Sequence, residues 1–310
     1  TRHLRKDARA DLHMPAAQVE SLSRIVQAID LLPGDVVCAQ IPVWNALTRQ
    51  ELLRIEVPGL ECNCITFMSD GKSILSGWSD GKIRAFLPQS GKLLYAINDA
   101  HNHGVTALQP THNCQRIVSG GQEGEVRVWR ISRQTQIMEC SLKEHRGRVD
   151  QVNVNNNDTQ AVSCSYDGSV IIWDIITHTR IMCMFQSTMF KAVVYHPDES
   201  QLLTTGSDRK ITYWDCFDAE AIRMLDGSTE GEVNALAITA AGEHFVSGGE
   251  DKVVKIWSYD EGMNCFKGIG HSGHITKIAI APNQQFVVTV GTEGAIFIWH
   301  MPKEVNGGAQ

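Results

Sequence analysis

The chain has 310 residues, 43% of them hydrophobic, with a formal net charge of −7 and an isoelectric point near 5.9. This acidic balance excludes a chain-wide contact with nucleic-acid phosphates, which requires a basic surface. No apolar run approaches the ~20 residues of a membrane span, and nine scattered cysteines favour a reducing compartment. We therefore expect no nucleic-acid partner, no membrane contact and no small-molecule substrate.

The first 57 residues carry the weakest pattern of the chain. Residues 1–18 are polar and partly basic, so we expect a linker or N-terminal extension, or else a basic arm that touches an acidic surface. The next apolar residues follow at helical spacing, which predicts an amphipathic helix or a distorted strand; they are Val19, Leu22, Val26 and Ile29. A turn at Pro33-Gly34-Asp35 then separates strands predicted at 36–44 and 52–57.

From about residue 60 to residue 300 one unit recurs, and residues 161–177 show it most fully. It consists of an apolar run with Ser163, a tight Asp167-Gly168 turn, an alternating strand and Trp173-Asp174. Asp-Gly between two strand-like runs predicts a hairpin. An aromatic residue follows each acidic turn residue by six positions, in the pairs Asp80/Phe86, Glu123/Trp129, Asp167/Trp173, Asp208/Trp214, Asp251/Trp257 and Glu293/Trp299.

With Trp44, the aromatic positions are 42, 43, 44, 41, 43 and 42 residues apart. Four residues before each acidic position stands Ser or Thr, namely Ser76, Ser119, Ser163, Thr204, Ser247 and Thr289. A period of 40–45 residues with four short strands and Trp-Asp is typical of a WD40 propeller. The sequence therefore predicts an all-β fold with seven blades of four-stranded antiparallel sheet.

We expect one propeller over residues 19–310, with six clear repeats at 60–300 and a poorly matching first blade at 19–57. No strand is predicted after Trp299, and an unclosed sheet edge is unfavourable. The strand that completes the last blade should therefore come from the residues before Trp44.

Four polar or aromatic residues of the third repeat, His145, Ser163, Asp167 and Trp173, include the residue types of a hydrolase triad. Parts of this set recur in every repeat, whereas a catalytic site would occur only once. We interpret them as a buried hydrogen-bond chain that satisfies polar groups within the blade. Because Gly71-Lys72-Ser73 lacks the leading glycine of a phosphate-binding loop and no zinc-ligand spacing occurs, we expect no catalytic, cofactor or metal site.

Partner-binding positions are predicted where one repeat departs from its siblings on an exposed turn. Trp78 stands where the other repeats carry Gly or Ser, so we expect it to project outward, either as an interface anchor or packed on a neighbouring loop. Tyr166, next to Asp167, would add an aromatic contact.

A second departure is basic. After the acidic residue four repeats have Gly81, Gly124, Gly168 and Gly294, whereas two neighbouring repeats have Arg209 and Lys252. With Lys210 they form a basic arc suited to an acidic protein surface, or else a solvated face.

Several stretches resemble the family of the cilia- and flagella-associated WD-repeat protein numbered fifty-two. The matching stretches are Arg49–Pro58, Asp70–Phe86, Gly206–Trp214, His244–Trp257 and Gly270–Ile278. The resemblance spans Trp44 to Trp299 and includes the unusual residues Trp78, Phe86 and Arg209.

That resemblance implies the C-terminal propeller of a two-propeller protein inside the doublet microtubules of motile cilia and flagella. Its members are bound to tubulin and to other axonemal proteins, so the implied location is the cytoplasmic cytoskeleton of the axoneme. The first ~40 residues depart from the family's pattern, because Cys38 stands where an acidic residue should precede Trp44.

Two other functions remain open. One is a cytosolic WD40 adaptor of another multiprotein complex, although the Trp-Asp-x-Arg of ubiquitin-ligase receptors is missing after Trp173 and Trp214. The other is an enzyme with its site in the propeller channel, which would need unique titratable residues in one or two blades. The repeat-wide polar residues disfavour the enzyme, and the resemblance favours the ciliary scaffold over the adaptor.

Overall fold

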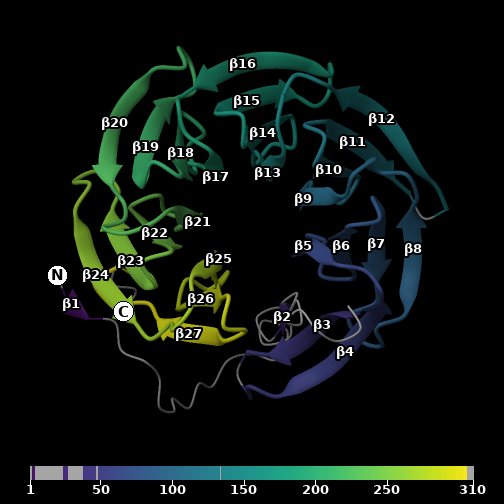
Figure 1. The fold of residues 1–310 in the computed structure, drawn as a ribbon, viewed down its shortest axis with the longest axis horizontal. Coiled ribbons are helices and arrows are strands. Elements are labelled where there is room, and N and C mark those ends of the chain that lie inside the picture. The colour runs from purple at the N-terminus through teal and green to yellow at the C-terminus, as the bar shows by residue number, and fades with distance from the viewer. Residues whose placement is uncertain (1, 4–23, 27–37, 47, 133, 306–310) are drawn as a thin grey trace. The chain divides into compact units, whose positions relative to one another are not determined.

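The computed structural model describes residues 2–3, 24–26, 38–46, 48–132 and 134–305. Within these ranges the regular structure consists of β-strands (Figure 1). Contacts divide the chain into two units, residues 15–186 and residues 1–14 with 187–310, and each unit is described by itself. In the described part of the chain no helix is long and apolar enough to cross a membrane.

Residues 15–186 form four antiparallel sheets. The first has three strands: β2 (Arg24–Val26), β3 (Cys38–Asn45) and β4 (Glu51–Pro58). The second has β5 (Cys62–Phe67), β6 (Ile74–Trp78), β7 (Ile83–Phe86) and β8 (Leu93–Ile97). The third has β9 (Val105–Pro110), β10 (Arg116–Gly121), β11 (Val126–Ile131) and β12 (Gln136–Leu142). The fourth has β13 (Val149–Val154), β14 (Gln160–Ser165), β15 (Ser169–Asp174) and β16 (Thr179–Phe185).

The other unit contains three sheets. One has β17 (Phe190–Tyr195), β18 (Gln201–Gly206), β19 (Lys210–Asp215) and β20 (Ala221–Asp226). The next has β21 (Val233–Ile238), β22 (His244–Gly249), β23 (Val253–Ser258) and β24 (Asn264–Ile269), with β1 (Arg2–His3) added in parallel to β24. The last has β25 (Ile275–Ile280), β26 (Phe286–Gly291) and β27 (Ile296–His300).

Each sheet is built by the same local signals. The acidic turn joins its second and third strands, as Asp167-Gly168 joins β14 to β15 with Gly168 at φ 85°. The pairing of the third and fourth strands then shifts register at the aromatic residue, for example between Ile172 and Trp173. Such a bulge increases local twist, so the recurring aromatic residue marks where the outer strand bends away.

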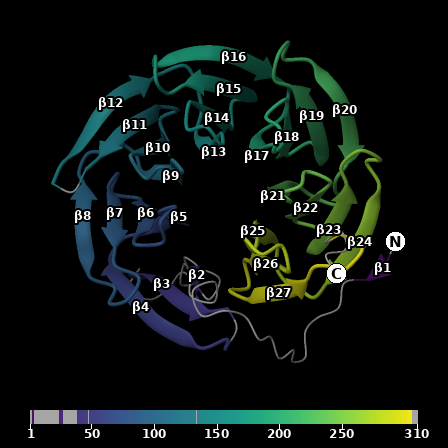
Figure 2. The same ribbon diagram turned by 180° about the vertical axis from the view of Figure 1, so that it is seen from behind.

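The hydrophobic core lies between successive sheets. β9 contacts both β5 and β13 (Figure 2), and one buried cluster joins Val118 and Val128 to Val152 and Trp173. Corresponding clusters lie between the other neighbouring sheets of each unit. Middle strands such as β14 and β15 are almost entirely buried, whereas the outer strand β16 is mostly exposed.

The predicted strands of residues 60–300 are confirmed, and so are those predicted at 36–44 and 52–57 within the described residues. The amphipathic helix is wrong where the structure tests it, because Val26 lies in β2, paired with Val43. The apolar residues have helical spacing, but strand pairing with β3 determines the structure at this position. The rest of that segment and the turn at Pro33-Gly34-Asp35 lie outside the described residues.

The prediction of seven four-stranded blades is corrected to six. Six sheets, from β5–β8 to β25–β27, carry the repeat, and five of them have the full four strands. The sheet β2–β4 precedes the repeats and has three strands. The predicted closing strand on β27 is not found among the described residues; the N-terminal strand β1 pairs with β24 instead.

Candidate functional site

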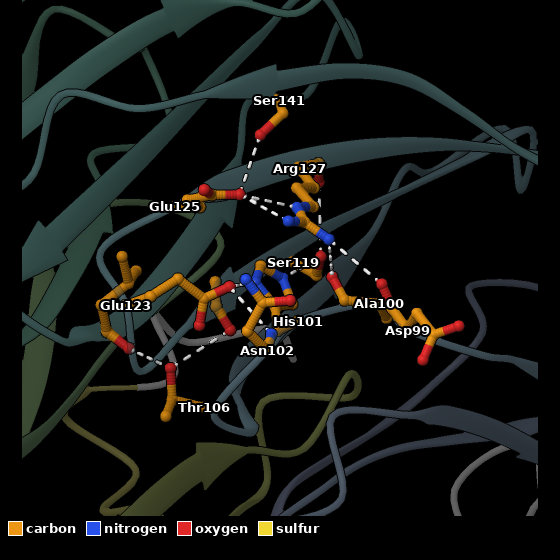
Figure 3. Close-up of polar contacts among 12 residues, drawn as sticks. Asp99, Ala100, His101, Asn102, Thr106, Ser119, Glu123, Glu125, Arg127 and Ser141 are labelled. Carbon is orange, nitrogen blue, oxygen red and sulfur yellow. Dashed lines mark hydrogen bonds and ion pairs between the residues drawn. The ribbon is translucent and has the colours of Figure 1, made fainter.

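Three blades contain a buried chain of hydrogen bonds from an indole to a carboxylate, and Figure 3 shows Ser119, His101 and Glu123 of one such chain. The indole Nε1 of Trp129 donates to Ser119 Oγ at 2.9 Å, and His101 Nε2 lies 2.8 Å from the same oxygen. His101 Nδ1 then lies 2.8 Å from Glu123 Oε1. Trp299, Thr289, His271 and Glu293 repeat this arrangement.

The predicted chain of the third repeat is present, with an additional member. Trp173 Nε1 donates to Ser163 Oγ at 2.8 Å, and His145 Nε2 lies 2.7 Å from that oxygen. Asp167 is too short to reach the imidazole closely, at 3.7 Å from Nδ1. Ser169 fills the gap, because its Oγ lies 2.6 Å from His145 Nδ1 and 2.5 Å from Asp167 Oδ1.

The protonation states of His101 and Glu123 determine which atoms donate and which accept in the hydrogen-bond chain around His101. Burial lowers the pKa of His101 below its ordinary value, although Glu123 beside it acts in the opposite sense. Burial would raise the pKa of Glu123, but hydrogen bonds from backbone N–H groups and His101 lower it overall. A neutral imidazole thus donates through Nδ1–H to the carboxylate and accepts at Nε2 from the Ser119 hydroxyl, which leaves each partner satisfied.

The same geometry separates these residues from a hydrolase triad. Ser163 is fully buried and its oxygen already accepts the indole N–H of Trp173. A nucleophilic serine must reach a substrate carbonyl, and a hydroxyl enclosed between two rings does not. The arrangement fixes the acidic turn of its blade.

Trp78 is a correction to the sequence analysis, because its side chain is fully buried rather than projecting outward. Its indole Nε1 donates to Ser76 Oγ at 2.7 Å, the bond that the later aromatic residue makes in other blades. In this repeat the later residue is Phe86, which has no N–H to donate, and Pro58 stands at the histidine position. Trp78 therefore supplies the missing donor from within the sheet.

Two of the three blades that lack the histidine hold the acidic turn with a cation instead. Arg84 Nη2 lies 2.6 Å from Asp80 Oδ2, and Lys255 Nζ lies 2.5 Å from Asp251 Oδ2. The Arg84 guanidinium also lies over the Trp78 ring, 5.2 Å from its centroid. Sequence reasoning missed these pairs, although a basic residue four positions after the turn Asp is a readable signal.

Two of the three residues of the predicted basic arc are exposed, and their role in binding is untested. Arg209 and Lys252 are exposed on the acidic turns of neighbouring sheets, and both have left-handed backbone angles, φ 66° and 63°. Lys210 is half-buried and its Nζ lies 2.5 Å from Asp226 Oδ1, which offsets its charge. Tyr166 is half exposed but belongs to the other unit, so its relation to the arc is untested.

An exposed aromatic residue was also missed. Phe217, in the turn between β19 and β20, is 92% exposed. It follows Trp214 by three positions, where the other repeats carry Gln89, Ser132, Ile176, Asp260 and Pro302. This departure from the repeat could have been found by comparing that turn along the chain.

The blades, the acidic turns and the buried indole–hydroxyl bonds define a β-propeller protein of the WD40 class. The chain matches the family described as WD domain, G-beta repeat, over residues 56–86, 91–130, 137–174, 178–215, 219–258 and 263–300. It belongs to this family.

The chain is also similar to proteins named cilia- and flagella-associated protein 52. It is 57% identical over 259 residues to that of Chlamydomonas reinhardtii, which covers 84% of this chain and 42% of the relative. It is 50% identical over 267 residues to that of Homo sapiens, covering 86% and 43%, and 49% identical over 285 residues to that of Bos taurus, covering 91% and 46%. The resemblance seen in the sequence motifs is thus confirmed, and the chain spans less than half the length of these relatives.

Proposed function

We propose that this chain is a non-enzymatic scaffold propeller of motile cilia and flagella, bound in the axoneme to the tubulin of the doublet microtubule and to neighbouring proteins. The similarity to cilia- and flagella-associated protein 52 in an alga and in mammals supports the ciliary setting. The contact with tubulin rests on the basic arc, since tubulin is an acidic surface.

The observation that carries the contact is the backbone conformation of Arg209 and Lys252. Four other blades place Gly at this turn position, with φ between 74° and 85°. A left-handed conformation costs a residue with a side chain roughly 1 kcal/mol, so two neighbouring turns hold exposed cations at a cost in stability. Strain retained at an exposed charge is expected where that charge binds a partner.

The test is co-pelleting of the purified chain with taxol-stabilised microtubules across a salt series. We expect bound protein to fall as salt rises, because exposed charges are screened. The double variant Arg209→Glu/Lys252→Glu should weaken binding about tenfold or more. Lys92→Glu, a single charge reversal at an exposed loop position in the other unit, is the control and should bind as wild type. Wild-type pelleting by the double variant would refute contact through the arc.

Glycine variants separate binding from folding. Arg209→Gly and Lys252→Gly remove the charge and the strain together, so each should raise the free energy of unfolding by roughly 0.5–1 kcal/mol while weakening microtubule binding. Urea denaturation measures the first effect and co-pelleting the second. A glycine variant that loses both stability and binding would mean that the side chain supports the fold instead.

Localisation tests the ciliary setting independently. A tagged chain expressed in flagellated cells should remain with the axoneme after detergent extraction. Recovery in the soluble fraction, together with failure to pellet, would favour the cytosolic adaptor.

A further inference from the structure

Phe217 is the most exposed of the large hydrophobic side chains in the described part of the chain. A single exposed apolar residue needs no explanation, but an almost fully solvated aromatic ring on an ordered turn is unusual. Its exposure raises the question of what covers it.

The turn that carries Phe217 is held in one conformation. Asp215 Oδ1 accepts the Phe217 N–H at 2.6 Å, and Asp218 Oδ1 accepts the Glu220 N–H at 2.9 Å. The backbone closes the loop between Asp215 and Glu220 at 2.9 Å, with Ala219 in a left-handed conformation at φ 65°. A pre-ordered turn loses little backbone entropy when a partner binds it.

Phe217 lies among four turns that are joined to one another. The Cys216 N–H donates to Ser200 O at 2.9 Å, and the His196 and Tyr259 rings lie 4.4 Å apart. The Tyr259 N–H donates to Glu243 O at 2.8 Å. Arg223 Nη1, in the strand β20 that follows the turn at 215–220, donates to Asp260 O at 2.6 Å. The turns at residues 196–200, 215–220, 239–243 and 259–263 therefore form one end of the sheets β17–β20 and β21–β24, which we call the acidic end.

The acidic end is mostly negative, although the Arg223 guanidinium reaches Asp260 O from β20. Its four turns contain no Lys or Arg, and their exposed carboxylates are Asp198, Asp218, Glu220, Glu243, Asp260 and Glu261. The basic arc lies at the other end of the same sheets, since β20 runs from Ala221 to Asp226, which pairs with Lys210. The exposed cations Arg209 and Lys252 thus lie at the opposite end of these two blades from the carboxylates of the acidic end.

We propose that the acidic end is a docking surface for a basic segment of a partner protein, one that places an apolar side chain on Phe217. An apolar centre inside a charged rim is the arrangement of interface hot spots, and charge complementarity selects a basic occupant. A second copy of this chain would offer the cations Arg209 and Lys252, but the turns 207–209 and 250–252 contain no apolar residue to meet the ring. The inference does not depend on the tubulin contact, which involves the opposite end.

The test uses a fluorescent peptide of alternating Lys and Gly with two central leucines, titrated with the whole chain and followed by anisotropy. Phe217→Ala should weaken binding about tenfold, and Asp218→Asn/Asp260→Asn should weaken it about fivefold and flatten its salt dependence. Phe185→Ala is the matched control, because Phe185 is also exposed, at 70%, in the other unit; it should bind as wild type.

Two further probes and one further variant complete the design. Peptides with Gly in place of Leu, or Glu in place of Lys, should bind at least tenfold more weakly. Phe217→Ala should have the wild-type free energy of unfolding and should co-pellet with microtubules as the wild type does. A failure of the docking proposal is therefore distinct from a failure of the tubulin contact. The proposal would be overturned if the Lys peptide bound Phe217→Ala as tightly as the wild type, or if the wild type bound the Glu peptide as tightly as the Lys peptide. Self-association of the chain abolished by Arg209→Glu would also overturn it, since it would make a second copy the occupant.

Discussion

At the scale of single residues, Trp78 shows how one substitution in a repeat compensates for others in the same repeat. Phe86 lacks an indole N–H and Pro58 lacks an imidazole, so the Ser76 hydroxyl would have neither partner found around Ser119. The indole of Trp78 occupies this space and donates to Ser76. Read alone, a large aromatic residue at a Gly position predicts exposure; read together with Phe86 and Pro58, it indicates compensation.

Replacing Trp78 with Phe should therefore destabilise the fold rather than an interface. The change removes a buried hydrogen bond and leaves a small cavity, so we expect a loss of roughly 1–3 kcal/mol in the free energy of unfolding. Urea denaturation measures it, with Leu94→Ala, at a half-exposed position, as a control that changes little. Wild-type stability combined with weakened partner binding would restore the reading of Trp78 as an interface anchor.

His101 makes part of the stability depend on pH. Because burial lowers the pKa of His101 below 6.5, the unfolded chain binds a proton below that pH more readily than the folded chain. Stability from this group is complete above pH 6.5 and falls as the pH decreases. Glu123, whose pKa is lowered from 4.5, contributes stability above its unfolded value and loses it as the pH falls further.

His101→Gln isolates that dependence. At pH 7.5 the variant should be less stable by about 1–2 kcal/mol, because the Ser119 and Glu123 bonds are weakened. Between pH 7 and pH 5 its free energy of unfolding should decline less steeply than that of the wild type. Parallel slopes for the two proteins would show that His101 does not titrate differently in the folded state.

Among elements, the blades differ in how the carboxylate of the acidic turn reaches its histidine. Glu123 and Glu293 contact the imidazole directly, at 2.8 and 2.5 Å, whereas Asp167 uses Ser169 as a bridge. The hydrogen bonds of Asp167 outweigh its burial and hold its pKa well below the usual range. The shorter side chain is thus matched by a hydroxyl two residues later.

A double-mutant cycle tests this match. Ser169→Ala should cost roughly 1–2 kcal/mol, because His145 Nδ1 loses its close partner. Adding Asp167→Glu should recover much of that loss, since a glutamate reaches the ring directly in two other blades. Thermal unfolding of the four proteins gives the coupling free energy, and additive effects would contradict the bridging role of Ser169.

The repeat predicted most elements because its turn, hydroxyl and aromatic positions each have a local physical cause. The strands of 60–300 and the Trp173–Ser163–His145 chain followed from spacing alone. Ser169 did not, since a bridging hydroxyl is recognised only when the distance from Asp167 to His145 is known. The exposure of Phe217 and the burial of Trp78 depended on which partners the surrounding sheet supplies.

At the scale of the whole molecule, sequence reasoning was weakest before the first repeat. Trp44 has the aromatic position and the bulge of a blade, but Gly34 stands where a Ser or Thr would precede it by ten residues. In the described part of the chain, the buried Nε1 of Trp44 accordingly has no hydrogen-bond partner. An aromatic spacing without its hydroxyl partner was a poor basis for counting a seventh blade.

The sheet β2–β4 nevertheless shares a core with the first repeat. Ile41, Val43 and Ile55 are buried in one cluster with Ile74, Trp78 and Phe86. A charge placed in this cluster lacks any compensating partner, so Ile41→Asp should destabilise β5–β7 as well as β3, by several kcal/mol. Hydrogen–deuterium exchange should show lost protection in both sheets, whereas Leu52→Asp, the same chemical change at a half-exposed position, should preserve it. Loss confined to β3 and β4 would mean that the repeats fold independently of the sheet that precedes them.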